Sequence, residues 1–142
     1  MDQRGRTLIE LISVMAIVGI LACLSSGFVS AATRYQAKAV RTELAAELRA
    51  ARHIAISERE KVRVVFDPAL PYIRTELVDT PHSVLRSYSF TGKDVAVEML
   101  SNGSSVTFYP SGRTATPNTI TLVNRRGERW RMTVSIMGQV NG

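Results

Sequence analysis

The sequence predicts an α+β fold in which one long N-terminal helix packs on an antiparallel β-sheet. Three features of the 142-residue chain support this prediction. An uncharged apolar run lies near the N-terminus, an amphipathic stripe follows it without a break, and the region after Glu60 alternates with period two. The length corresponds to about one domain.

The N-terminal part of the chain is apolar enough to cross a membrane as a helix. Between Thr7 and Thr33 the only side chain charged at neutral pH is Glu10. The uncharged stretch Leu11–Thr33 has 23 residues, so a helix there is about 35 Å long, against a hydrocarbon core of about 30 Å. Its large apolar side chains favour insertion by roughly 5 kcal/mol, more than a carboxylate near one end opposes it. We therefore expect a membrane-spanning segment at residues 6–33.

An amphipathic helix is expected to continue from this segment. No Pro or Gly interrupts the chain between Phe28 and Glu60, and charged residues occupy all but one face. An ordinary secretory signal cut near Ala32 is an alternative for the apolar run, although the helical pattern continues past that point. The head is predicted at residues 34–142, with its helix at 34–60. Apolar residues recur at helical spacing at Val40, Leu44, Leu48, Ala51 and Ala55.

After Glu60 the pattern changes to that of β-strands separated by Gly- and Pro-containing turns. Short strands at this spacing indicate a mostly antiparallel sheet over residues 61–142, with the helix stripe covering one face. The candidate strands are Val62–Phe66, Tyr72–Val78, Val84–Phe90, Val95–Leu100, Val106–Tyr109, Thr119–Val123 and Trp130–Ile136.

Residues suited to catalysis are scarce. The histidines His53 and His82 and the single cysteine Cys23 have no spacing typical of a metal site, and no glycine-rich phosphate loop is present. Ser111 lies in a Pro-Ser-Gly turn and not in the strand-to-helix turn of a hydrolase nucleophile. We expect neither an enzyme nor a cofactor or metal site.

A basic cluster near the C-terminus is a candidate nucleic-acid site. The chain has a net charge of +6, and four of its arginines fall within seven residues around an expected turn at Gly127, with Glu128 between them. Such a cluster beside Trp130 suits backbone phosphates and a stacked base. The alternative is a solvated turn and a strand whose Trp130 faces the core. The four residues are Arg125, Arg126, Arg129 and Arg131.

A glycine, a glutamate and an apolar run occur together at the N-terminus, in Gly5-Arg6-Thr7-Leu8-Ile9-Glu10-Leu11. This pattern resembles the processing signal of type IV prepilins and type II secretion pseudopilins. The resemblance implies that prepilin peptidase removes residues 1–5 as a leader by cutting after Gly5. It also implies N-methylation of the new amine of Arg6, where most members have Phe. Glu10, five residues into the mature chain, would then pair with the terminal amine of a neighbouring subunit, a role that suits a carboxylate isolated in an apolar span.

Short motifs in the head resemble a narrower group. Ala51–Glu58, Phe108–Gly112 and Val134–Gly138 are similar to the GspH/FimT branch, which comprises minor pseudopilins of type II secretion and minor pilins of type IV pili. The resemblance implies a pilin-like fold and a structural subunit of a pseudopilus or pilus. It places the subunit in the inner membrane with a periplasmic head before assembly. Expected partners are other pilins or pseudopilins, prepilin peptidase, the inner-membrane assembly platform and membrane lipid.

Two other functions stay open from the sequence. Some FimT-like members bind DNA through a C-terminal Gly-Arg-x-Arg, but this chain reads Gly138-Gln139-Val140-Asn141 there, so that site does not carry over. A DNA-binding minor pilin of a competence pilus, acting through the four-arginine cluster, is therefore the alternative function. The third hypothesis is a signal-anchored membrane protein without a filament role.

Overall fold

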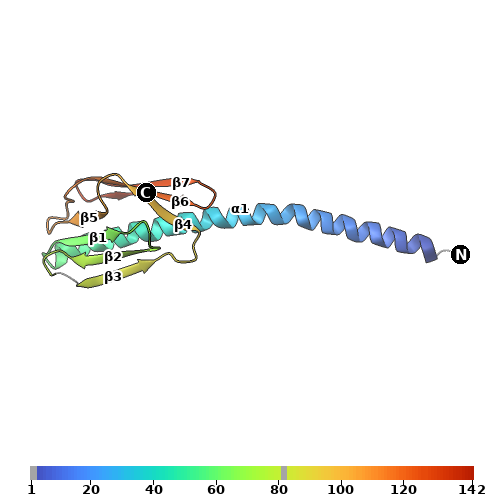
Figure 1. The fold of residues 1–142 in the computed structure, drawn as a ribbon, viewed down its shortest axis with the longest axis horizontal. Coiled ribbons are helices and arrows are strands. Elements are labelled where there is room, and N and C mark those ends of the chain that lie inside the picture. The colour runs from blue at the N-terminus through green and yellow to red at the C-terminus, as the bar shows by residue number, and fades with distance from the viewer. Residues whose placement is uncertain (1–2, 81–82) are drawn as a thin grey trace. The chain divides into compact units, whose positions relative to one another are not determined.

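The computed structural model describes residues 3–80 and 83–142, and within helix α1 the side chains of residues 3–7 and 24–34 lie outside the description. Two compact units are present, Met1–Tyr35 and Gln36–Gly142. Helix α1 (Gln3–Ser57) contributes to both (Figure 1). The sequence predicts a helix to Glu60, but Arg59 has a φ of 56°. A right-handed helix cannot contain that conformation, so α1 ends earlier.

In the first unit, α1 exposes a large apolar surface. Its large apolar side chains from Leu8 to Leu21 are between 53% and 69% exposed. Within the described residues, no helical stretch is both long enough and apolar enough to cross a membrane. The side chains of Arg6 and Ala32 and the residue His82 lie outside the description.

The second unit contains two four-stranded sheets in which all strand pairs are antiparallel (Figure 1). The first sheet has the order β3-β2-β1-β5 and consists of β1 (Val62–Phe66), β2 (Tyr72–Leu77), β3 (Val84–Ser89) and β5 (Ser105–Phe108). The second has the order β4-β6-β7-β8 and consists of β4 (Val95–Leu100), β6 (Asn118–Asn124), β7 (Arg129–Val134) and β8 (Val140–Asn141). The antiparallel α+β prediction is confirmed. The division into two sheets and the strand β8 were not predicted.

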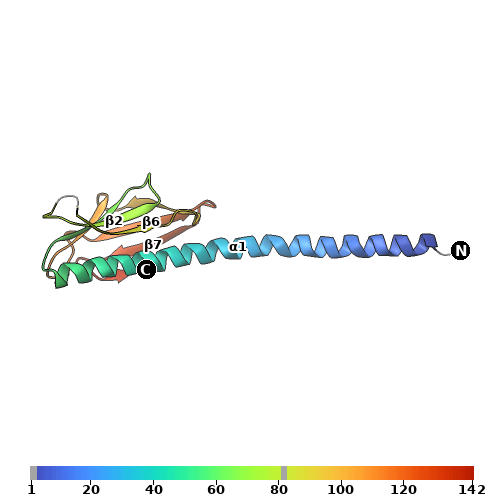
Figure 2. The same cartoon turned by 90° about the horizontal axis from the view of Figure 1, so that it is seen from below.

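The apolar stripe of α1 forms one side of the core of this unit. All five predicted stripe residues are buried, together with Ala37 and Ala45. Figure 2 shows this part of α1 running along one side of the strands. Inward-facing side chains of both sheets complete a single core with the helix, and the largest of them are Phe66, Ile73, Phe108, Ile120, Leu122 and Met132. Because each such side chain contributes about 1.5–3 kcal/mol on burial, the stripe holds α1 against both sheets.

Candidate functional site

Glu10, the residue expected to act in assembly, lies in α1 among exposed apolar side chains. Its own side chain is exposed, and within the described part of the chain it has no ion-pair or hydrogen-bond partner. One turn away, the Ser13 hydroxyl donates a 2.8 Å hydrogen bond to the Ile9 carbonyl, so this polar group is satisfied within the helix. The Glu10 carboxylate is therefore available to a group from outside the chain.

Two arginines of the four-arginine cluster pair with Asp94, just before strand β4, and with Glu98 in β4. The Arg125 Nε atom lies 3.0 Å from Asp94 Oδ1. Arg129 donates two hydrogen bonds of 2.7 Å to the Glu98 carboxylate. These bonds lower the pKa of Glu98 and raise that of Arg129. The fold thus compensates part of the charge that the sequence presents as a basic cluster.

Side chains alternate along β7, so its arginines and Trp130 lie on opposite faces of the strand. Trp130 is half-buried and packs against the core, whereas Arg129 and Arg131 are exposed on the opposite face. Among the described residues, Arg126 and Arg131 are the two members of the cluster without a described ion pair. Asp94 and Glu98 thus offset two of the four positive charges of the cluster. A phosphate that replaced Glu98 at Arg129 would have to break two hydrogen bonds, so this ion pair weakens the attraction of Arg129 for DNA.

Sequence reasoning missed Asp94 and Glu98 because they lie some thirty residues before the arginines. Only the register of the sheet brings them together, with Val95 opposite Asn124 and Val123 opposite Arg129. Asn124 also shapes the turn, since its Oδ1 accepts hydrogen bonds from the backbone N–H groups of Arg126 (3.0 Å) and Glu128 (2.9 Å).

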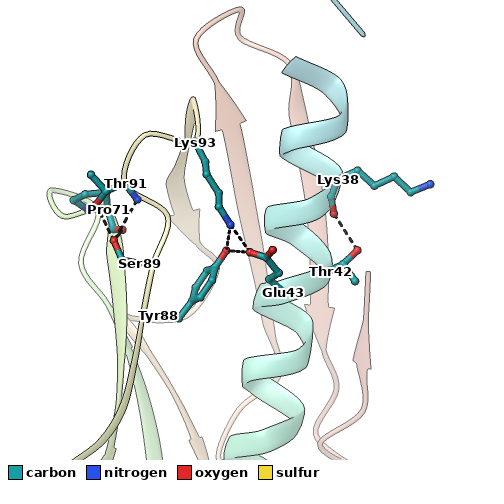
Figure 3. Close-up of polar contacts among 8 residues, drawn as sticks. All are labelled: Lys38, Thr42, Glu43, Pro71, Tyr88, Ser89, Thr91 and Lys93. Carbon is teal, nitrogen blue, oxygen red and sulfur yellow. Dashed lines mark hydrogen bonds and ion pairs between the residues drawn. The ribbon is translucent and has the colours of Figure 1, made fainter. Parts of the chain in front are cut away.

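Polar side chains join one flank of α1 to β3 and the following turn (Figure 3). The Glu43 carboxylate accepts hydrogen bonds from Lys93 Nζ and from the Tyr88 hydroxyl, and Lys93 also lies 3.2 Å from that hydroxyl. Lys93 and then Tyr88 lower the pKa of Glu43. Burial and the Glu43 carboxylate raise the pKa of Tyr88. These contacts fix the position of the helix, and they offer no group poised for chemistry.

Two turns meet at the opposite flank of α1. Arg52 Nε donates a 2.9 Å hydrogen bond to the Gly112 carbonyl. Gly112 and Gly138 close the turns Tyr109–Gly112 and Ser135–Gly138, and both have positive φ, 75° and 73°. A Cβ atom on Gly138 would lie 2.0 Å from the Gly112 carbonyl oxygen. The glycines of the two head motifs are therefore needed for the turns to approach each other.

Comparison with known proteins agrees with this architecture. The family model described as type II transport protein GspH matches residues 41–138. The type IV minor pilin FimU of Pseudomonas aeruginosa has a similar structure, with a TM-score of 0.64 and 18% identity over 76% of this chain and 88% of that one. The minor pseudopilin EpsH of the Vibrio cholerae type 2 secretion system is also similar, with a TM-score of 0.61 and 15% identity over 75% of this chain and 94% of that one. No curated protein matches the chain. At these identities the structural similarity establishes a pilin-like fold.

Proposed function

The chain belongs to the GspH family of type II transport proteins, and we propose that it is a minor pseudopilin or minor pilin that enters a filament through α1. One observation carries this proposal. Ten large apolar side chains between Leu8 and Leu21 are more than half exposed on one helix. Soluble monomers rarely expose a contiguous apolar surface of this extent, so lipid or the helices of other subunits must cover it.

The location that we propose follows from this surface. Before assembly, residues 6–33 lie in the inner membrane, and the head of residues 34–142 lies in the periplasm. On assembly the apolar helix moves from lipid into a bundle of similar helices, which bury the same surface. The change in apolar burial is then small, so assembly is directed by packing and polar contacts between subunits.

We propose a specific polar contact for Glu10. Prepilin peptidase cuts after Gly5, the new amine of Arg6 is N-methylated, and this amine pairs with Glu10 of a neighbouring subunit. The carboxylate is exposed and has no partner among the described residues, which supports the proposal. Inside a helical bundle the pair is desolvated, and removal of one partner leaves an uncompensated charge at a cost of about 3–5 kcal/mol. Such a contact fixes the axial register of adjacent helices.

Intact-mass measurement of the chain from a host that assembles the filament tests the processing step. We expect a product lacking residues 1–5. An uncut chain, or a cut near Ala32, in a host whose other prepilins are processed normally would contradict the proposal.

Recovery in the filament fraction tests the role of Glu10. Glu10→Gln keeps the size of the side chain and removes its charge, and we expect it to lower incorporation at least tenfold. Ser13→Ala is a matched control on the next turn of the same helix and should incorporate normally. If Glu10→Gln also incorporates normally, the assigned contact is wrong.

A further inference from the structure

A groove between the end of α1 and strand β3 has an apolar floor and an acidic rim. Its volume is about 370 Å³. The apolar side chains of Ile54 and Leu77 pack against the core at its floor, and Leu85 is 39% exposed beside them. Glu58, Glu60 and Arg86 complete the lining.

A β-bulge places Leu85 at this groove. In the pairing of β2 with β3, Thr75 is opposite Arg86 but Glu76 is opposite Val84, so Leu85 has no cross-strand partner. A bulge bends the strand locally and redirects a side chain. Because β3 is an edge strand, the same bulge disfavours the addition of another strand there. The groove is therefore suited to bind a side chain and not to extend the sheet.

The residues that follow α1 supply the acidic rim. The Glu58 N–H donates the last helical hydrogen bond, 2.9 Å long, to the Ile54 carbonyl. Arg59 then adopts its left-handed conformation, and Glu60 follows on the same groove. A left-handed non-glycine residue persists only where the surrounding structure holds it, and such residues are frequent at ligand sites.

The carboxylates of the rim differ from the others in the head. Among the ten Asp and Glu residues of the second unit, all described by the structure, Glu58 and Glu60 have neither an ion pair nor a side-chain hydrogen bond. Arg86, the basic residue of the groove, is held by Glu47 through bonds of 2.8 and 3.1 Å. The other eight are satisfied within the fold: Glu43, Glu47, Asp67, Glu76, Asp79, Asp94, Glu98 and Glu128.

We propose that this groove binds a segment of a neighbouring filament subunit in which an apolar side chain is flanked by Lys or Arg. The apolar side chain fills the floor formed by Ile54, Leu77 and Leu85, and the flanking cations pair with Glu58 and Glu60. Charge complementarity selects this occupant, because the two unpaired carboxylates border the apolar floor. The inference rests on the proposed filament role and adds the chemistry of one contact between heads.

Photo-leucine incorporated into the full chain, in cells that assemble the filament, tests the occupant without enlarging the side chain. We expect irradiation to link Leu85 to another subunit at a site with Lys or Arg within about two residues of it. Leu70, which is 37% exposed in the β1–β2 loop, is an internal control with similar exposure and should not give this product.

Charge reversal tests the role of the rim. Glu58→Lys with Glu60→Lys should lower the yield of the Leu85 crosslink by about two- to thirtyfold, the range that two exposed ion pairs provide. Asp94→Lys with Glu98→Lys makes the same change in net charge elsewhere on the head and should leave the yield unchanged.

The outcomes separate the groove from the filament role. If the chain is recovered in the filament but Leu85 links only to lipid, or to a segment without nearby Lys or Arg, the groove inference is overturned and the filament role stands. An unchanged yield after charge reversal at the rim also overturns it. If the wild-type chain is absent from the filament, both proposals fail together.

Discussion

Replacement of Gly138 by alanine tests the contact between the two turns beside α1. The new Cβ atom would lie 2.0 Å from the Gly112 carbonyl oxygen and 2.9 Å from Arg52 Nε. Favourable separations of non-bonded heavy atoms are about 3.5–4.0 Å. The turns must therefore move apart, and the hydrogen bond from Arg52 to the Gly112 carbonyl is strained or broken.

Gly127→Ala is a matched control that measures how much stability an alanine at positive φ loses without a close contact. Gly127 has a φ of 77°, close to the 73° of Gly138, but nothing lies within 4 Å of an added Cβ atom. Left-handed alanine costs about 1–2 kcal/mol, and the stiffer unfolded chain offsets roughly 0.5–1 kcal/mol. We expect Gly127→Ala to lower the free energy of unfolding by about 1 kcal/mol. Gly138→Ala should lose this amount and more. Weakening of the hydrogen bond from Arg52 to the Gly112 carbonyl adds roughly 1.5–3 kcal/mol to the loss, and overpacking adds about 1–3 kcal/mol.

Denaturant unfolding of the full chain in detergent micelles measures this difference. Trp130 is the only tryptophan and packs against the core, so its fluorescence reports unfolding of the head. We expect Gly138→Ala to be at least about 2 kcal/mol less stable than Gly127→Ala. If the two variants differ by less than roughly 0.5 kcal/mol, the turns do not make the close contact described, and the reasoning from Gly112 is wrong.

Three further predictions use the same unfolding measurement. Leu48→Ala should lower the free energy of unfolding by about 2–5 kcal/mol because Leu48 is fully buried. Leu70 is 37% exposed, and an equal loss of stability in Leu70→Ala would show that burial does not explain the loss. Arg59→Gly should raise stability by up to about 1 kcal/mol, since it removes left-handed strain at a φ of 56°, and a decrease would refute that account. Lys93 lowers the pKa of Glu43 below its ordinary 4.5, so the stabilisation is present above pH 4.5 and is lost as the pH falls through the lowered value. Glu43→Gln should therefore cost up to about 1 kcal/mol at pH 7, and this cost should decrease as the pH falls below 4.5. A pH-independent difference would argue against the contact.

The helix that builds the core was predictable because its signal is local. Val40, Leu44, Leu48, Ala51 and Ala55 repeat at helical spacing, and all five are buried. The strand positions were also predicted within about two residues, since alternation and turn residues act over a few positions. The end of α1 was placed three residues too late, because the left-handed conformation of Arg59 has no glycine to indicate it.

The sequence pattern does not indicate which distant strands pair with each other. Alternation predicts strands at Val95–Leu100 and Thr119–Val123, but it does not show that these strands form a second sheet. Strand β8 has two residues, which is too short to show the alternation of apolar and polar side chains that marks a strand. The second sheet and strand β8 both depend on contacts between residues far apart in the chain, and local propensity does not determine such contacts.

The sequence by itself determined the apolar N-terminal surface, the isolated Glu10 and the glycine that precedes them, because these features depend only on residue type and spacing along one helix. Tertiary structure decided how the charges of the head are used. It brought Asp94 and Glu98 to Arg125 and Arg129, and among the described residues it left Glu58 and Glu60 without an ion pair at an apolar groove. The physical reason is that an ion pair depends on distance in space, and strand register sets that distance across tens of residues.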